Sequence, residues 1–75
     1  MELLTAVKDF YQRLKDFHLI EEVPNYEVID DIAEKVYQGN YKELDKYIIV
    51  TLAPEYYSAL KEARETIVHI VDEDK

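Results

Sequence analysis

A chain of 75 residues is about half the usual length of a domain, so it has room for one hydrophobic core and not for two. Apolar residues make up 48% and charged residues 35%, with a single Gly, which excludes a disordered or fibrous chain. The net charge of −8 argues against direct binding to nucleic acid or anionic membrane, and the lack of Cys excludes disulfides, thiolate metal sites and cysteine nucleophiles.

The first predicted helix covers residues 2–20. Its apolar residues recur at intervals of four and three, which places them on one stripe: Leu3, Val7, Phe10, Leu14 and Phe17. His18 is expected in its last turn. Pro24 closes the region, because a proline disfavours helical backbone in the residue before it.

The second predicted helix covers residues 25–38. Asn25 is a residue type that caps helix N-termini, and Gly39 supplies the left-handed conformation that ends many helices. Between them the apolar residues again have helical spacing.

A third helix is predicted over residues 41–52 and a fourth over residues 54–71. The third is apolar nearly all round, so we expect it to be the most buried element. Pro54 suits the first position of the fourth helix. The acidic tail at residues 72–75 places carboxylates at the negative end of the helix dipole, so we expect it to fray.

These elements predict an all-α fold, a compact four-helix bundle-like single domain. Residues 47–52 and 66–71 are rich in β-branched and aromatic residues, as strands are, so an α+β fold with a small two-stranded ribbon is the alternative. We favour the all-α fold because an isolated two-stranded ribbon is marginally stable.

An Arg and a His with four residues between them stand in the last helix, in the sequence RETIVH at 64–69. This spacing resembles the R-x4-H motif of HEPN ribonucleases, helical-bundle proteins in which the Arg and His act on a phosphodiester, usually across a dimer. The resemblance implies catalysis by Arg64 and His69. Helical geometry leaves the two side chains about 140° apart, so a shared site would need a second chain. The other interpretation pairs Arg64 with neighbouring carboxylates and leaves His69 in solvent beside Glu62 and Glu65.

Four carboxylates line one face of the second helix at positions i, i+3, i+4 and i+7: Glu27, Asp30, Asp31 and Glu34. They form either a solvated face or an acidic docking face for a basic protein. The chain contains neither an EF-hand loop nor a Glu-x-x-His motif, so we predict no metal and no cofactor.

The third helix follows a short turn and begins with Lys42 and Lys46, an arrangement that could act as a helix-turn-helix DNA reader. Two lysines do not outweigh a net charge of −8, so this is a minor hypothesis.

Seven Tyr residues and several aliphatics off the main stripes exceed what one small core can bury, and Tyr is frequent at interface hot spots. The interface candidates are Tyr47, Ile49, Val50, Tyr56, Tyr57, Val68 and Val71. The leading hypothesis is a non-enzymatic protein-protein interaction module, a small acidic accessory subunit or a homo-oligomer, whose partner is a basic protein or itself. No signal peptide or membrane span is recognisable, which predicts a cytoplasmic protein, and the composition is thermophile-like.

Overall fold

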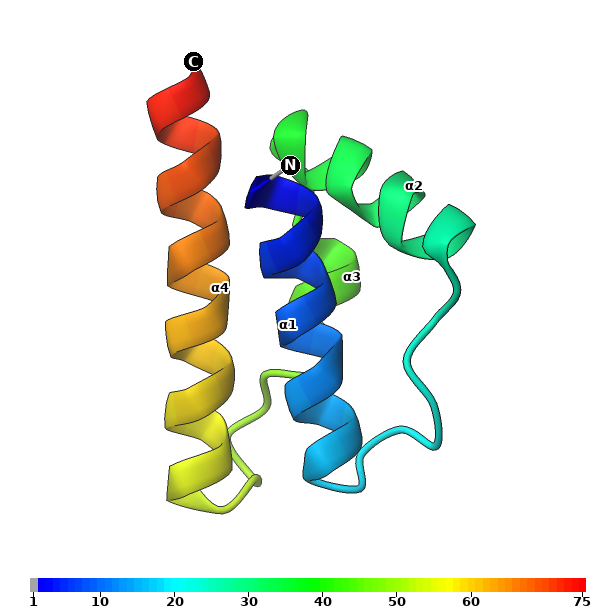
Figure 1. Ribbon diagram of the computed structural model, residues 1–75. Coiled ribbons are helices and arrows are strands. Elements are labelled where there is room, and N and C mark those ends of the chain that lie inside the picture. The colour runs from blue at the N-terminus through cyan, green and yellow to red at the C-terminus, as the bar shows by residue number, and fades with distance from the viewer. Residues whose placement is uncertain (1) are drawn as a thin grey trace.

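The computed structural model describes residues 2–75, which form four helices (Figure 1): α1 Glu2–Asp16, α2 Tyr26–Tyr37, α3 Lys42–Asp45 and α4 Pro54–Asp74. Residues 2–75 contain no strand, so the predicted all-α class is confirmed. The ribbon alternative is wrong, because residues 66–71 lie inside α4 and residues 47–52 form turns.

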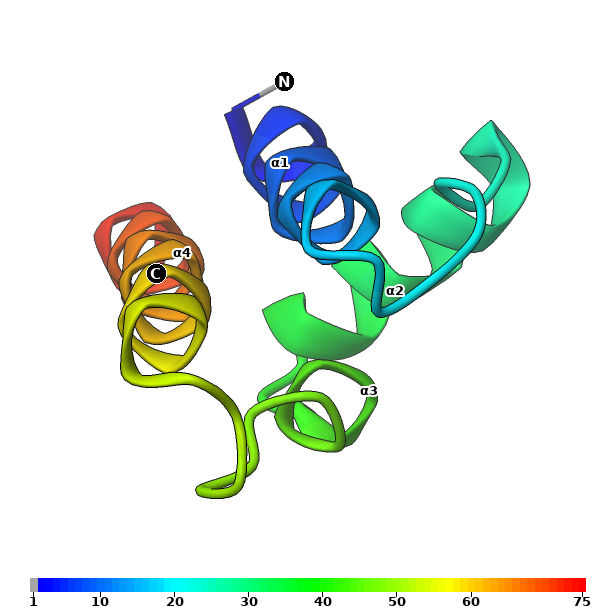
Figure 2. The ribbon, with the colours of Figure 1, turned by 90° about the horizontal axis from the view of Figure 1, so that it is seen from below.

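The long helices α1 and α4 lie side by side and run in opposite directions (Figure 1). Seen from below in Figure 2, α1 lies between α4 and α2, with α3 beneath them. The helix α1 is therefore covered by α2 on one side and by α4 on the other. Its buried residues are Val7, Phe10, Tyr11 and Leu14. Most of the apolar stripe predicted for the first helix thus lies in the core of the molecule.

Every helix contributes to one hydrophobic core, as the length of the chain requires. The fully buried side chains are Phe10, Leu14, Leu44, Leu60, Ile67, Val7 and Val36. The apolar stripe predicted for the first helix supplies three of them: Val7, Phe10 and Leu14.

The helix α2 ends in a left-handed residue, as predicted. Gly39 has a φ of 93°. Its amide donates to the carbonyl of Val36, and the next amide, of Asn40, donates to the carbonyl of Lys35, both at 2.9 Å. This pattern is the Schellman motif, which satisfies carbonyls at a helix C-terminus.

The helix α1 ends earlier than predicted, at Asp16 rather than at residue 20, because the same motif forms around His18. His18 has a φ of 62°. Its amide donates to the carbonyl of Lys15, and the amide of Leu19 donates to the carbonyl of Leu14, both at 2.9 Å. A left-handed histidine in place of a glycine strains the backbone.

The predicted third helix over residues 41–52 is wrong: α3 has four residues, and turns follow it as far as Pro54. The β-branched run at residues 48–51 has low helix propensity, which favours this early end. The expectation that this helix is the most buried element is also wrong. Leu44 is the one buried residue of α3.

The acidic tail does not fray, since α4 continues to Asp74. The last turn contacts Tyr37 at the end of α2. The ammonium group of Lys75 lies 5.1 Å from the centroid of the Tyr37 ring, and hydrogen bonding to Asp74 raises the pKa of Tyr37. These contacts offset the unfavourable placement of carboxylates at a helix C-terminus.

The two matching helix ends generate a prediction about stability. Replacing His18→Gly should raise the free energy of unfolding by up to about 1 kcal/mol, because glycine adopts positive φ without strain. Replacing Gly39→Ala should lower it by about 1 kcal/mol through the backbone alone, since no atom lies within 4 Å of the added Cβ. Urea unfolding measures both changes. A destabilised His18→Gly variant would show that the backbone at residue 18 carries no strain.

Candidate functional site

Arg64 is half-buried and binds α3. Its Nε donates to Oδ1 of Asp45 at 2.6 Å and its Nη2 to Oδ2 at 3.4 Å. The guanidinium group also lies 4.8 Å from the centroid of the Tyr41 ring. The Arg64 side chain therefore joins α4 to the short helix α3, and its carboxylate partner comes from another helix.

His69 lies on an exposed part of α4, where its Nε2 is 3.1 Å from Oε1 of Glu73, one turn further on. The carboxylates expected beside it, Glu62 and Glu65, are not its partners in this ion pair. Arg64 and His69 thus have separate partners, and a single chain does not bring them to one site. Catalysis by this pair stays a hypothesis that requires a second chain.

The helix-turn-helix interpretation loses its recognition helix, because α3 is only four residues long. The ammonium group of Lys46 lies 3.2 Å from Oε2 of Glu43, and this hydrogen bond raises the pKa of Lys46. It also lies 5.3 Å from the centroid of the Tyr47 ring. The ammonium group of Lys46 therefore already has both of these partners within its own segment.

The predicted acidic face is present on α2, where Glu27, Asp30, Asp31 and Glu34 are all exposed. Asp31 forms an ion pair with Lys35 at 3.2 Å, one turn further on. No group of three or more His, Asp or Glu side chains among residues 2–75 is placed to hold a metal ion.

The interface candidates divide by burial. Val71 is 3% exposed and belongs to the core, so it is not a free surface residue. Tyr57 and Val68 are half-buried on α4, and Tyr56 is stacked on Phe17 with the ring centroids 4.2 Å apart. By contrast, two candidates in the α3–α4 connection, Ile49 and Val50, are exposed.

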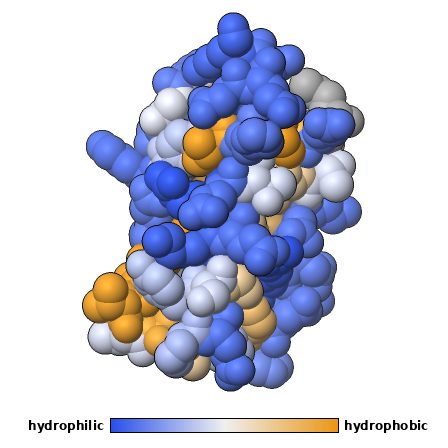
Figure 3. Space-filling view, turned by 90° about the vertical axis from the view of Figure 1, so that its left-hand side faces the viewer, coloured by the Kyte–Doolittle hydropathy of each residue, from blue (hydrophilic) through white to orange (hydrophobic). Residues whose placement is uncertain are grey.

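Ile49 and Val50 are 48% and 86% exposed, and together they are called the apolar tip below. The amide of Leu52 donates to the carbonyl of Ile49 at 3.1 Å, which closes a turn with Val50 and Thr51 at its corners. Figure 3 shows hydrophobic surface at the lower left, at the end of the molecule where this connection lies.

The apolar tip is held by side chains on both sides of it. Tyr47, Ile48 and Leu52 pack against the core. The Tyr47 ring meets the buried Tyr11 ring edge to face, with the centroids 6.0 Å apart. Burial raises the pKa of Tyr11, and the nearby Tyr47 and Glu43 raise it further. Tyr11 therefore stays neutral at ordinary pH, as its place in the core requires.

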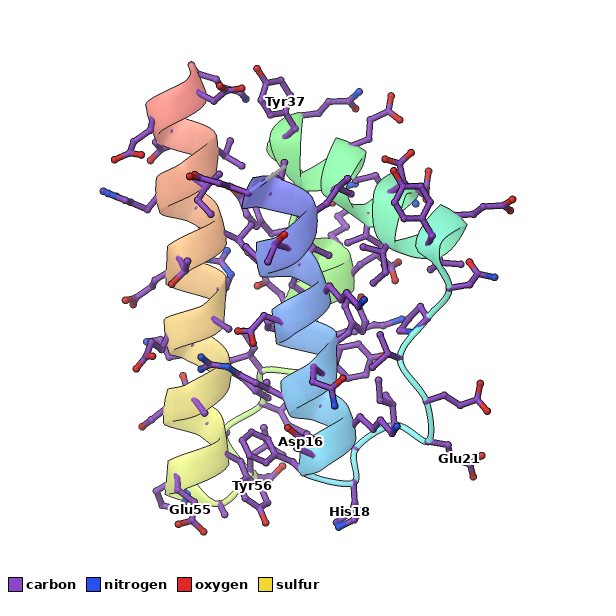
Figure 4. All side chains as sticks on the ribbon, in the orientation of Figure 1. Asp16, His18, Glu21, Tyr37, Glu55 and Tyr56 are labelled. Carbon is purple, nitrogen blue, oxygen red and sulfur yellow. The ribbon has the colours of Figure 1, made fainter. Side chains whose placement is uncertain are left out.

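Sequence reasoning missed a hollow at the opposite end of the molecule. It lies where the first turn of α1, the end of α2 and the last turns of α4 meet, and Leu3, Tyr37 and Asp74 line it. Figure 4 shows Tyr37 at this end, beside the top of α4. No periodicity could have revealed it, because its residues are far apart in the sequence.

No protein-family profile, curated protein or solved structure matches this chain. None of the helices in residues 2–75 has the length and hydropathy needed to span a bilayer.

The positions of Arg64 and His69 generate a prediction about RNA cleavage. We expect the purified chain to leave end-labelled single-stranded RNA intact, because Arg64 is paired with Asp45 and His69 lies apart from it. Denaturing gels after long incubation measure this. Cleavage that disappears in His69→Ala and persists in His18→Gly, which removes the other histidine of the chain, would instead establish the ribonuclease hypothesis.

Proposed function

We propose that this chain is a non-enzymatic protein-interaction module that binds through its apolar tip. It acts either as a small acidic accessory subunit on another protein or as a homo-oligomer. The 86% exposure of Val50 at the corner of a turn carries the proposal.

The local structure gives no reason for an apolar residue at this corner. Turn corners are usually occupied by Gly, Pro, Asn, Asp or Ser, which supply turn geometry or hydrogen bonds. Val50 supplies neither, and the core does not cover it. Single exposed apolar side chains are common on protein surfaces, but here Ile49 stands beside Val50 and is half exposed. A pair of this kind is better explained by a partner that buries it.

The apolar tip has the properties of an interface anchor. Burying one aliphatic side chain contributes about 1.5–3 kcal/mol, so the pair can supply the centre of a hot spot. The flanking residues Tyr47, Ile48 and Leu52 are already packed, which lowers the cost of ordering on binding. A stable interface buries roughly 800 Å² per partner, so neighbouring half-buried side chains must join the tip.

The charge of the chain distinguishes the two forms of the proposal. Two copies that each carry −8 repel each other, so self-association should strengthen as salt screens that repulsion. A basic partner is attracted by the same charge, and its binding should weaken with salt. The salt dependence therefore identifies which partner the module uses.

Replacing Val50→Asp should weaken association strongly, because it places a charge where the partner covers an apolar surface. We expect the dissociation constant to rise at least about tenfold. Light scattering during gel filtration measures self-association, and quantitative affinity purification from native cells measures binding to another protein. The free energy of unfolding should change little, since Val50 is exposed.

The matched control is Thr51→Asp, which adds the same charge at the adjacent corner of the turn, on a residue that is already polar and exposed. It should retain most of the association. A chain that stays monomeric and has no stoichiometric partner would contradict the proposal, as would association that Val50→Asp leaves intact.

A further inference from the structure

The hollow at the far end of the molecule consists of two adjoining depressions of about 420 Å³ and 440 Å³. They share Leu3, Tyr37 and Asp74, so they form one continuous groove between α1, α2 and α4. The apolar tip lies at the other end of the α1–α4 pair (Figure 1). The two surfaces are therefore separate.

The groove combines an apolar floor with acidic edges. Leu4 and Ala33 from the second depression and Ile70 from the first contribute to the floor. Its edges carry five carboxylates: Glu2, Asp30, Glu34, Glu73 and Asp74. No Lys or Arg is among the described residues that line either depression. An occupant that matches this surface must be both apolar and positively charged.

The ring of Tyr37 already contacts a cation. The ammonium group of Lys75 lies 5.1 Å from its centroid, while hydrogen bonding to Asp74 raises the pKa of Tyr37. Tyr37 is 38% exposed, so part of the ring is open to solvent. An aromatic face beside a carboxylate is a favourable place for a Lys or Arg side chain. Lys75 shows that the geometry accepts one.

We propose that this groove binds a basic amphipathic segment of a partner protein, in which Lys or Arg residues alternate with Leu-like residues. The apolar side chains cover Leu3 and Ile70, and the cations pair with the carboxylates at the edges. This inference rests on the proposed function, that the chain acts by binding proteins. It assigns the groove contacts that are both apolar and charged, whereas the contact at the apolar tip is apolar.

The groove also divides the acidic face of α2 into two halves. Asp30 and Glu34 line the groove, whereas Glu27 and Asp31 do not. The two pairs have the same spacing and the same charge. Their neutral variants therefore form a matched comparison, in which the net charge changes equally and only the position differs.

The test is a titration of the ¹⁵N-labelled full chain, followed by amide chemical shifts. The probe, called the Lys/Leu peptide, is a synthetic helical peptide in which blocks of Lys alternate with blocks of Leu. The reference is a Lys/Ser peptide of the same length and charge, in which Ser replaces Leu. The Lys/Leu peptide should shift the amides around Leu3, Tyr37 and Ile70 and should bind at least about tenfold more tightly than the reference. Equal binding of the two peptides, or shifts centred on Val50, would overturn the proposal.

The variants then test the position of the carboxylates. The pair Asp30→Asn and Glu34→Gln should weaken binding of the Lys/Leu peptide about tenfold, while Glu27→Gln and Asp31→Asn should change it by no more than about twofold. Equal losses would mean that net charge alone attracts the peptide, and the groove proposal would fail.

The Val50→Asp variant distinguishes a failure of the groove proposal from a failure of the proposed function. It should bind the Lys/Leu peptide normally, because the apolar tip is distant from the groove. If Val50→Asp abolishes the natural association while the peptides show no preference for the groove, the interaction module stands and the groove proposal falls. If the groove binds as described but Val50→Asp leaves natural association intact, the apolar tip is wrong and the groove remains.

Discussion

The rest of the structure depends on the packing of α1 between α2 and α4. Phe10 and Leu14 of α1 are fully buried, as are Leu60 and Ile67 of α4. A chain this short builds only one such core, so every other segment must pack on it or remain in solvent. The α3–α4 connection does both, because Tyr47 packs against Tyr11 while Val50 stays exposed.

Both proposed surfaces follow from the antiparallel arrangement of α1 and α4. The connection that enters α4 lies at one end of this pair, and the last turn of α4 meets Tyr37 at the other. The first surface is an apolar pair presented by a turn, and the second is an apolar floor edged by carboxylates. Salt weakens the charged contacts of the groove directly, whereas at the apolar tip it acts through the net charges of the chain and its partner. One small domain can therefore hold two partners of different chemistry.

Much of the fold could be predicted from the sequence, because three of its helices have regular apolar spacing and recognisable ends. Asn25 caps α2 as predicted, with its Oδ1 accepting from the amide of Val28 at 3.1 Å. The segment at residues 47–52 could not be predicted, because its helical spacing conflicts with its β-branched composition, and the contact of Tyr47 with Tyr11 forms only in the folded chain. Among the interface candidates, Ile49 and Val50 are exposed, and their part in an interface stays a prediction. The groove could not be predicted from the sequence, because only the folded chain brings its residues together.

Binding through the apolar tip requires that the tip is an organised surface held by the core and not a loose loop. Backbone ¹⁵N relaxation of residues 48–52 tests it most directly, because order parameters distinguish the two. We expect order parameters near those of α1 and α4, about 0.85. Values below about 0.6 would show a flexible loop in which exposure of Val50 has no structural meaning, and would contradict the account.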